Sequence, residues 1–229
     1  MGRTEILREI GIGVGDYRVE LVGHSVYNRA GEHQPPQPGQ PALTFRTVSG
    51  GSVEELIKIA QLSAIQEKEL GRPTIYLVAL FQNTIAHQAN LNANQVTEHM
   101  QTLAKFFRVE LHNYHRLAFI NVIRCPELNG HSDTINTINR LCERFNSSDG
   151  QSPCDPGKTL EKTKSVLRRC RDRNGRKLNK GKLIKRVIQQ PNKWREHLNG
   201  TGPGYHPHVK SMPAIVSYLR NWAKHYKVN

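Results

Sequence analysis

The sequence predicts an α/β protein, a three-layer α/β/α sandwich on a small parallel sheet, extended by a basic helical insertion. Two observations predict this fold class. Short apolar runs typical of strands alternate along the chain with segments in which apolar residues recur at helical spacing, as in parallel sheets with helices on both faces. Most of the positive charge, by contrast, lies in one segment that follows those runs.

Four segments are expected to form the sheet. They are residues 16–22, 43–48, 75–81 and 117–123. The third is continuously apolar and follows Thr74, which is the pattern of a strand buried on both faces of a parallel sheet. Because ligands of such sheets gather at the carboxyl ends of the strands, a functional site is expected where these segments end.

Helices are expected between and after these strands. Ser52 fits a helix N-cap, with Glu54 and Glu55 in the first turn, where the helix dipole favours acidic groups. The apolar residues that follow, up to Ile65, recur at helical spacing. Similar patterns predict helices over residues 94–114, 134–145 and 212–226.

Three regions are expected along the chain. Residues 1–146 form the α/β body, and residues 202–229 form a loop and a helix that return to this body. Residues 147–201 form a linker and the basic helical insertion. The linker, 147–157, is rich in Ser, Pro, Gly and Asp, and two basic helices are expected beyond it, at about 159–173 and 182–198.

The net charge of +14 is concentrated in residues 158–197, where fifteen basic and three acidic residues give +12. Such a segment attracts phosphate backbones by releasing counterions, so RNA, DNA or another polyanion is an expected partner. The alternative is a solubilising basic face. Trp194 is the only aromatic residue of the segment, which favours contact with the backbone over stacking on bases. The residues expected to bind nucleic acid are Arg168, Arg169, Arg171, Arg173, Arg176, Lys177, Lys180, Lys182, Lys185 and Arg186.

Other classes of protein find no support in the sequence. No apolar stretch approaches the ~18 residues of a membrane span, and the first residues lack the apolar core of a signal peptide, so an intracellular location, cytoplasmic or nuclear, is expected. None of the four cysteines pairs at Cys-x-x-Cys spacing, which favours reduced thiols over disulfides or a metal site. The glycine run at 11–15 precedes a strand, and the Gly-Lys-Thr at 157–159 follows a polar linker, so neither predicts a nucleotide cofactor.

Polar residues at the predicted strand ends suggest acyl-transfer chemistry. Ser25 follows the first strand and could act as a nucleophile once a base removes its proton. The backbone N–H groups of Gly50 and Gly51 and the amide of Asn83 could hold an oxyanion. His206 or His208, both in a Gly/Pro-rich loop before the last helix, could be the base. The structural alternatives are a helix cap for the serine, a simple turn for the glycines and an exposed loop histidine.

These residues and their order resemble the SGNH (GDSL-type) hydrolase superfamily, a three-layer, flavodoxin-like fold. The Gly-Asp-Ser block of that family is similar to residues 23–25, and its Ser-Gly-rich turn is similar to residues 48–53. Its Gly-x-Asn-Asp block resembles residues 81–84, and its Asp-x-x-His block resembles residues 203–206. The resemblance implies Ser25 as nucleophile, Gly50 and Asn83 in the oxyanion hole and His206 as base.

The sequence departs from the family at four positions. His24 stands for the Asp of the first block, Phe81 and Thr84 for the Gly and Asp of the third, and Pro203 for the Asp that would orient the base. The expected function is therefore an esterase-type serine hydrolase, active or impaired, acting on a small ester without a cofactor. The alternative is a non-catalytic nucleic-acid-binding module on the same fold, of the kind a virus or mobile element could encode.

Overall fold

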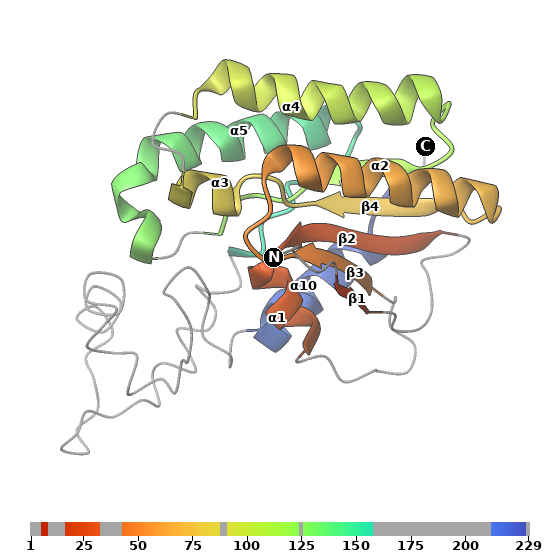
Figure 1. Cartoon of the computed structure of the whole chain (residues 1–229), viewed down its shortest axis with the longest axis horizontal. Helices are drawn as coiled ribbons and strands as arrows, with labels where there is room; N and C mark the ends of the chain where they lie inside the picture. The colour runs from red at the N-terminus through yellow and green to blue at the C-terminus, as the bar shows by residue number, and fades with distance from the viewer. Residues whose placement is uncertain are drawn as a thin grey trace.

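The computed structural model describes residues 6–8, 17–32, 43–87, 91–123, 126–157 and 212–227 of the 229-residue chain (Figure 1). The strands are β1 (Ile6–Arg8), β2 (Arg18–His24), β3 (Leu43–Val48), β4 (Thr74–Val78) and β5 (Arg116–Phe119). The α-helices are α1 (Ser25–Glu32), α2 (Val53–Glu69), α3 (Gln82–His87), α4 (Ala93–Lys105), α5 (Ser132–Ser148) and α10 (Met212–Lys224). A π-helical turn, η1 (Phe106–Glu110), and a 3-10 helix, η2 (Pro126–His131), accompany them.

The strands form one sheet in the order β1-β3-β2-β4-β5. Strands β2 to β5 run parallel, as the alternation of strands and helices predicts, whereas β1 pairs antiparallel with β3. The register aligns His24 with Val48, and Val22 with Val78. The carboxyl ends of β2, β3 and β4 therefore lie at the same edge of the sheet.

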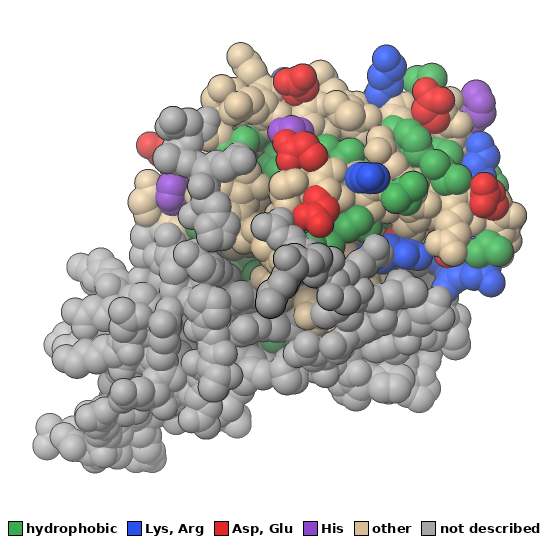
Figure 2. All heavy atoms as spheres, in the orientation of Figure 1, with side chains coloured by type: hydrophobic (Ala, Val, Ile, Leu, Met, Phe, Trp, Pro, Cys, Tyr) green, Lys and Arg blue, Asp and Glu red, His purple; other side chains and the backbone are tan. Residues whose placement is uncertain are grey.

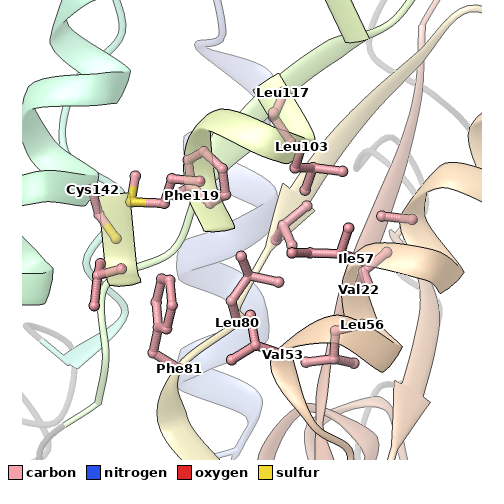
Figure 3. Close-up of a cluster of buried hydrophobic side chains, with 14 of the residues drawn as sticks. Val22, Val53, Leu56, Ile57, Leu80, Phe81, Leu103, Leu117, Phe119 and Cys142 are labelled. Carbon is pink, nitrogen blue, oxygen red and sulfur yellow. The ribbon is translucent and has the colours of Figure 1, made fainter. Parts of the chain in front are cut away.

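Helices cover both faces of the sheet, which confirms the predicted three-layer sandwich (Figure 1). One apolar cluster joins the sheet to α2, α4 and α5 and includes Val22, Leu56, Leu103 and Cys142 (Figure 3). A second cluster joins the opposite face to α1 and α10. Each cluster consists of buried side chains, so burial of apolar surface is the main term that holds the three layers together.

Several element boundaries differ from the sequence prediction. Strand β5 ends at Phe119 and not at 123. The N–H groups of Ile120 and Asn121 still bond to the backbone carbonyls of Val78 and Cys154, whereas those of Val122 and Ile123 bond to side-chain amides. Helix α4 ends at Lys105, and the chain then continues as the π-helical turn η1. Helices α1 and α3 were not predicted, since each begins within a few residues of the end of a strand and leaves no polar linker as a signal. Strand β1 was not predicted either.

Part of the segment predicted as a linker packs against the body. Helix α5 extends to Ser148, and Cys154 forms a parallel bridge with Ile120 beside β5. The indole N–H of Trp222 in α10 donates to the Ser152 carbonyl at 3.2 Å. Residues 151–157 thus join the edge of the sheet to the last helix. The two predicted basic helices lie outside the described residues, so the division of the chain into three regions stays a prediction.

No helix in the described ranges combines the length and the apolar character needed to cross a bilayer. The exposed face in Figure 2 carries acidic and basic side chains interspersed with small apolar patches. This agrees with a body that is close to neutral, because residues 158–197 hold +12 of the net +14.

Candidate active site

The structure brings three of the four predicted catalytic residues to one edge of the sheet. Ser25 is the first residue of α1 and directly follows β2. Gly50 lies in the turn after β3, and Asn83 is the second residue of α3, shortly after β4. Since β2 lies between β3 and β4, the three segments emerge side by side.

Gly50 adopts a left-handed backbone conformation with φ of +70°, which glycine reaches without the strain of a side chain. Among the described residues its N–H has no acceptor. A Cβ built on Gly50 would lie 4.0 Å from Nδ2 of Asn83, so the turn and this amide are neighbours. The Gly50 N–H is thus a donor available to a ligand beside Asn83.

The side chain of Asn83 supplies a second donor at this place. Its Nδ2 donates to the Gly51 carbonyl at 3.3 Å, which ties α3 to the turn after β3. An amide nitrogen carries two hydrogens, so this bond leaves one for a ligand. A backbone N–H and a side-chain amide placed together are the kind of donors that stabilise the oxyanion of an acyl-transfer reaction.

A capping box fixes the turn that carries Gly50. The hydroxyl of Ser52 accepts from the Glu55 N–H at 3.2 Å, and the Ser52 N–H donates to the Glu55 carboxylate at 3.4 Å. This confirms Ser52 as the N-cap of α2, as its position in the sequence predicts. The cap satisfies helix N–H groups that would otherwise lack partners, and it holds the end of the turn in place.

His24, next to Ser25, is a buried and neutral residue. It is 1% exposed, and its Nε2 donates to the Leu80 carbonyl at 2.7 Å. Nδ1 has no hydrogen-bond partner in the described part of the chain. Burial lowers the pKa of His24 to about 4, although the bond to Leu80 acts in the opposite direction. The first block of the predicted site therefore presents a neutral imidazole where the resembled family has a carboxylate.

Gln82, which precedes Asn83, was not singled out in the sequence. Its Nε2 donates to the Ile123 carbonyl at 2.8 Å, and its Oε1 accepts from the Ile123 N–H, also at 2.8 Å. Gln82 therefore bonds to both backbone polar groups of Ile123, a two-bond contact that we call a clamp. No pattern in the sequence connects residues 82 and 123, so this contact could not be found without the fold.

Other expected residues lie outside the described ranges. They are His206 and Pro203, the cysteines at 125 and 170, and all ten basic residues expected to bind nucleic acid. Their predicted roles stay predictions.

The two described cysteines, Cys142 and Cys154, are free and buried, and burial raises the pKa of Cys142 to about 12. The described residues contain no group of three or more His, Cys, Asp or Glu side chains that could hold a metal ion.

His115 is a second buried histidine, beside the amino-terminal ends of β4 and β5 and therefore at the edge of the sheet opposite the site. Its Nδ1 accepts from the Thr74 N–H at 3.1 Å, and its Nε2 donates to the Ala64 carbonyl at 2.8 Å. Both ring nitrogens are therefore used in joining α2 to the start of β4. A catalytic role is not available to this ring.

Solved structures of other proteins share this fold. A proposed acylhydrolase of Bacteroides fragilis superposes with a TM-score of 0.60 at 10% identity, covering 93% of this chain and 88% of that one. The chain has the fold of the GDSL-type hydrolases. A member of the lipolytic G-D-S-L family from Veillonella parvula matches with a TM-score of 0.51 at 11% identity, over 77% of this chain and 99% of that one. A proposed arylesterase of Agrobacterium tumefaciens matches with a TM-score of 0.53 at 10% identity, over 90% and 97% of the two chains.

The sequence itself matches no family model and no curated protein. The resemblance predicted from four short blocks is thus confirmed in the fold, at identities of 10–11%. Because the comparison shows the fold alone, the chemistry of the site has to be inferred from the residues of this chain.

Proposed function

We propose that the protein is an esterase-type serine hydrolase that cleaves small acyl esters. The observation that carries this proposal is the pair of donors at the carboxyl edge of the sheet, the Gly50 N–H and the Asn83 amide, beside the residue that follows β2. GDSL-type hydrolases and acylhydrolases among the structural neighbours support the same class of reaction.

The reaction proceeds through an acyl-enzyme. Oγ of Ser25 attacks the ester carbonyl carbon while the imidazole of His206 takes the hydroxyl proton. The carbonyl oxygen becomes an oxyanion, which accepts hydrogen bonds from the Gly50 N–H and Asn83 Nδ2. The intermediate collapses, the C–O bond to the alcohol breaks, and His206 returns the proton to the leaving oxygen. Water then attacks the acyl-serine with the same base, releasing the acid and free Ser25.

The departures from the family bear on the rate of this reaction. Pro203 stands where the family has the Asp that orients the base, and loss of such a carboxylate lowers kcat by ~10⁴ in a serine protease. The residual acceleration of a site without its full triad is still ~10³–10⁴ over water. Slow turnover that depends on Ser25 is therefore the expected behaviour.

The test is hydrolysis of p-nitrophenyl acetate by the wild type, by Ser25→Ala and by Ser49→Ala. Ser49 is an exposed serine at the same edge of the sheet and serves as the matched control. Ser25→Ala is expected to abolish turnover, whereas Ser49→Ala retains it. Asn83→Leu is expected to lower kcat by ~10²–10³, the cost of one oxyanion donor. Equal turnover by wild type and Ser25→Ala would falsify the proposal.

We propose polyanion binding as a second function, which can coexist with the first. The observation that favours it is the net charge of +12 in residues 158–197, against a nearly neutral remainder. A segment of this density contacts phosphates without reading the sequence of bases. In a hydrolase, it would locate the enzyme on an anionic surface; in an inactive protein it would be the main function.

Salt dependence of RNA and DNA binding tests this function. Affinity, followed by fluorescence anisotropy, is expected to fall by ~10³ or more between 50 and 200 mM salt if many phosphates are contacted. The double variant Arg168→Gln, Arg169→Gln should reduce the slope of the salt dependence by ~2. The matched control removes two exposed lysines of the body, Lys58→Gln and Lys105→Gln, and should leave the slope unchanged. Binding that is absent or insensitive to salt rejects the proposal.

A further inference from the structure

The segment of residues 80–83 connects the ends of four strands through hydrogen bonds. The Leu80 carbonyl accepts from His24 at the end of β2. Asn83 donates to Gly51 after β3. Gln82 makes two bonds to Ile123 beyond β5, while the segment itself continues from β4. The position of the Asn83 amide is therefore set by contacts to every neighbouring strand end.

Apolar packing fixes the first half of this segment. Leu80 and Phe81 are 1% and 2% exposed and lie in the apolar cluster with Val53 of α2 (Figure 3). The second half has no such anchor, because Asn83 is polar and half-buried. Further along, Ile85 of α3 is 1% exposed and returns to the same apolar cluster, so the start of α3 is held between this contact and the polar contact of its first residue, Gln82, which is 5% exposed.

The Gln82 contact is strong for a single side chain. Both of its bonds to Ile123 measure 2.8 Å, near the optimum for N–H···O bonds. The two bonds join one amide side chain to both polar groups of a single backbone residue. A side chain held at two points cannot rotate, so the backbone that carries it, and Asn83 beside it, is held too.

We propose that Gln82 is a positioning residue that holds the Asn83 amide where the oxyanion forms. The inference rests on the proposed hydrolase function, and it adds to it the residue that organises its oxyanion hole. Gln82 itself touches no substrate. Its loss lets α3 shift relative to the turn of Gly50, and a displacement of ~1 Å in a catalytic group can lower a rate by ~10²-fold.

The chain offers a matched control for this proposal. Asn139 of α5 makes the same kind of two-bond contact, to the N–H and carbonyl of Val122, at 2.7 and 3.3 Å. Val122 adjoins Ile123, but α5 carries no residue of the site. Gln82→Met and Asn139→Leu each remove one such clamp while keeping the approximate size of the side chain, so both are expected to lower the melting temperature.

The experiment measures kcat and KM for p-nitrophenyl acetate in wild type, Gln82→Met and Asn139→Leu, below the melting temperature of each. Gln82→Met is expected to lower kcat by ~10²-fold with KM nearly unchanged, because the oxyanion forms only during the reaction. Asn139→Leu should retain kcat within about threefold, as expected for a clamp without a role in the site. Equal kcat in wild type and Gln82→Met, or an equal loss in both variants, overturns the inference.

A measurement that does not depend on turnover separates this inference from the proposed function. The NMR signals of the Asn83 side-chain amide are expected to shift in Gln82→Met and to stay in place in Asn139→Leu. Unchanged Asn83 signals in Gln82→Met overturn the positioning role even if the protein hydrolyses esters. If wild type shows no turnover dependent on Ser25, the proposed function fails, while shifted signals still establish that Gln82 sets the position of the amide.

Discussion

The two buried histidines predict that the protein loses stability as the pH falls from about 6.5 to about 4. Burial lowers the pKa of both His24 and His115 from 6.5 to about 4. A proton on Nδ1 of His115 would face the Thr74 N–H, which is also a donor, and a proton on Nδ1 of His24 would have no acceptor among the described residues. The native state therefore resists protonation that the unfolded chain accepts freely.

The magnitude follows from these pKa values. Between about pH 6.5 and pH 4 the unfolded state binds one more proton at each histidine, so the free energy of unfolding falls by ~1.4 kcal/mol per pH unit and per histidine in the middle of this range. From pH 7 to pH 5 the loss is ~2 kcal/mol for each residue. Burial raises the pKa of Glu20. This raised pKa increases the free energy of unfolding as the pH falls, opposite to the effect of the histidines, because the native carboxyl takes up its proton more readily than the unfolded one.

Urea unfolding between pH 5 and 7.5, followed by far-UV circular dichroism, isolates the histidine terms when variants are compared with wild type, since the contribution of Glu20 cancels. His115→Asn keeps an acceptor near the position of Nδ1, and His24→Gln keeps a donor near that of Nε2. Each variant should flatten the slope of stability against pH by ~1.4 kcal/mol per unit. The control for removing a histidine is His112→Gln, at an exposed position. Slopes identical to wild type in both variants would refute the reasoning.

Two further predictions concern the edge of the sheet. Gly50→Ala and Gly71→Ala should each lower the free energy of unfolding by ~1–2 kcal/mol, because φ is +70° at Gly50 and +67° at Gly71. Only Gly50→Ala should also lower esterase kcat, because its new methyl group would lie 4.0 Å from Nδ2 of Asn83. Comparable kcat in the two variants would argue against an oxyanion hole at Gly50. Asn146→Leu removes two buried bonds of 3.0 and 2.9 Å to the N–H and carbonyl of Phe119. It should cost ~2–4 kcal/mol in a urea titration, since both backbone groups would stay buried without partners, and a loss under ~1 kcal/mol would show that water replaces the amide.

Three side-chain amides bond to the backbone at the end of β5 and just beyond it. Asn146, Asn139 and Gln82 bond to Phe119, Val122 and Ile123, which are the last residue of β5 and two residues beyond it. Each amide satisfies the N–H and the carbonyl of one backbone residue. The apolar run at 117–123 predicted a longer strand because periodicity reports burial and not the identity of the hydrogen-bond partner.

Residue patterns were sufficient to predict the strands of the parallel sheet and the three-layer class. Apolar runs and helical spacing depend on neighbours in the chain, and the polar residues after three strands were expected at one edge because parallel strands end there. The N-cap at Ser52 was predictable for the same reason, since its partner is Glu55, three residues away.

The tertiary structure alone decided which polar groups of the site have partners. The neutral state of His24 depends on burial among distant elements and on the Leu80 carbonyl, 56 residues away. The open N–H of Gly50 and the clamp of Gln82 on Ile123 likewise depend on packing between segments that are far apart in the chain. A sequence specifies such contacts only through the whole fold, because hydrogen bonds and desolvation act over a few ångströms of space, whatever the separation along the chain.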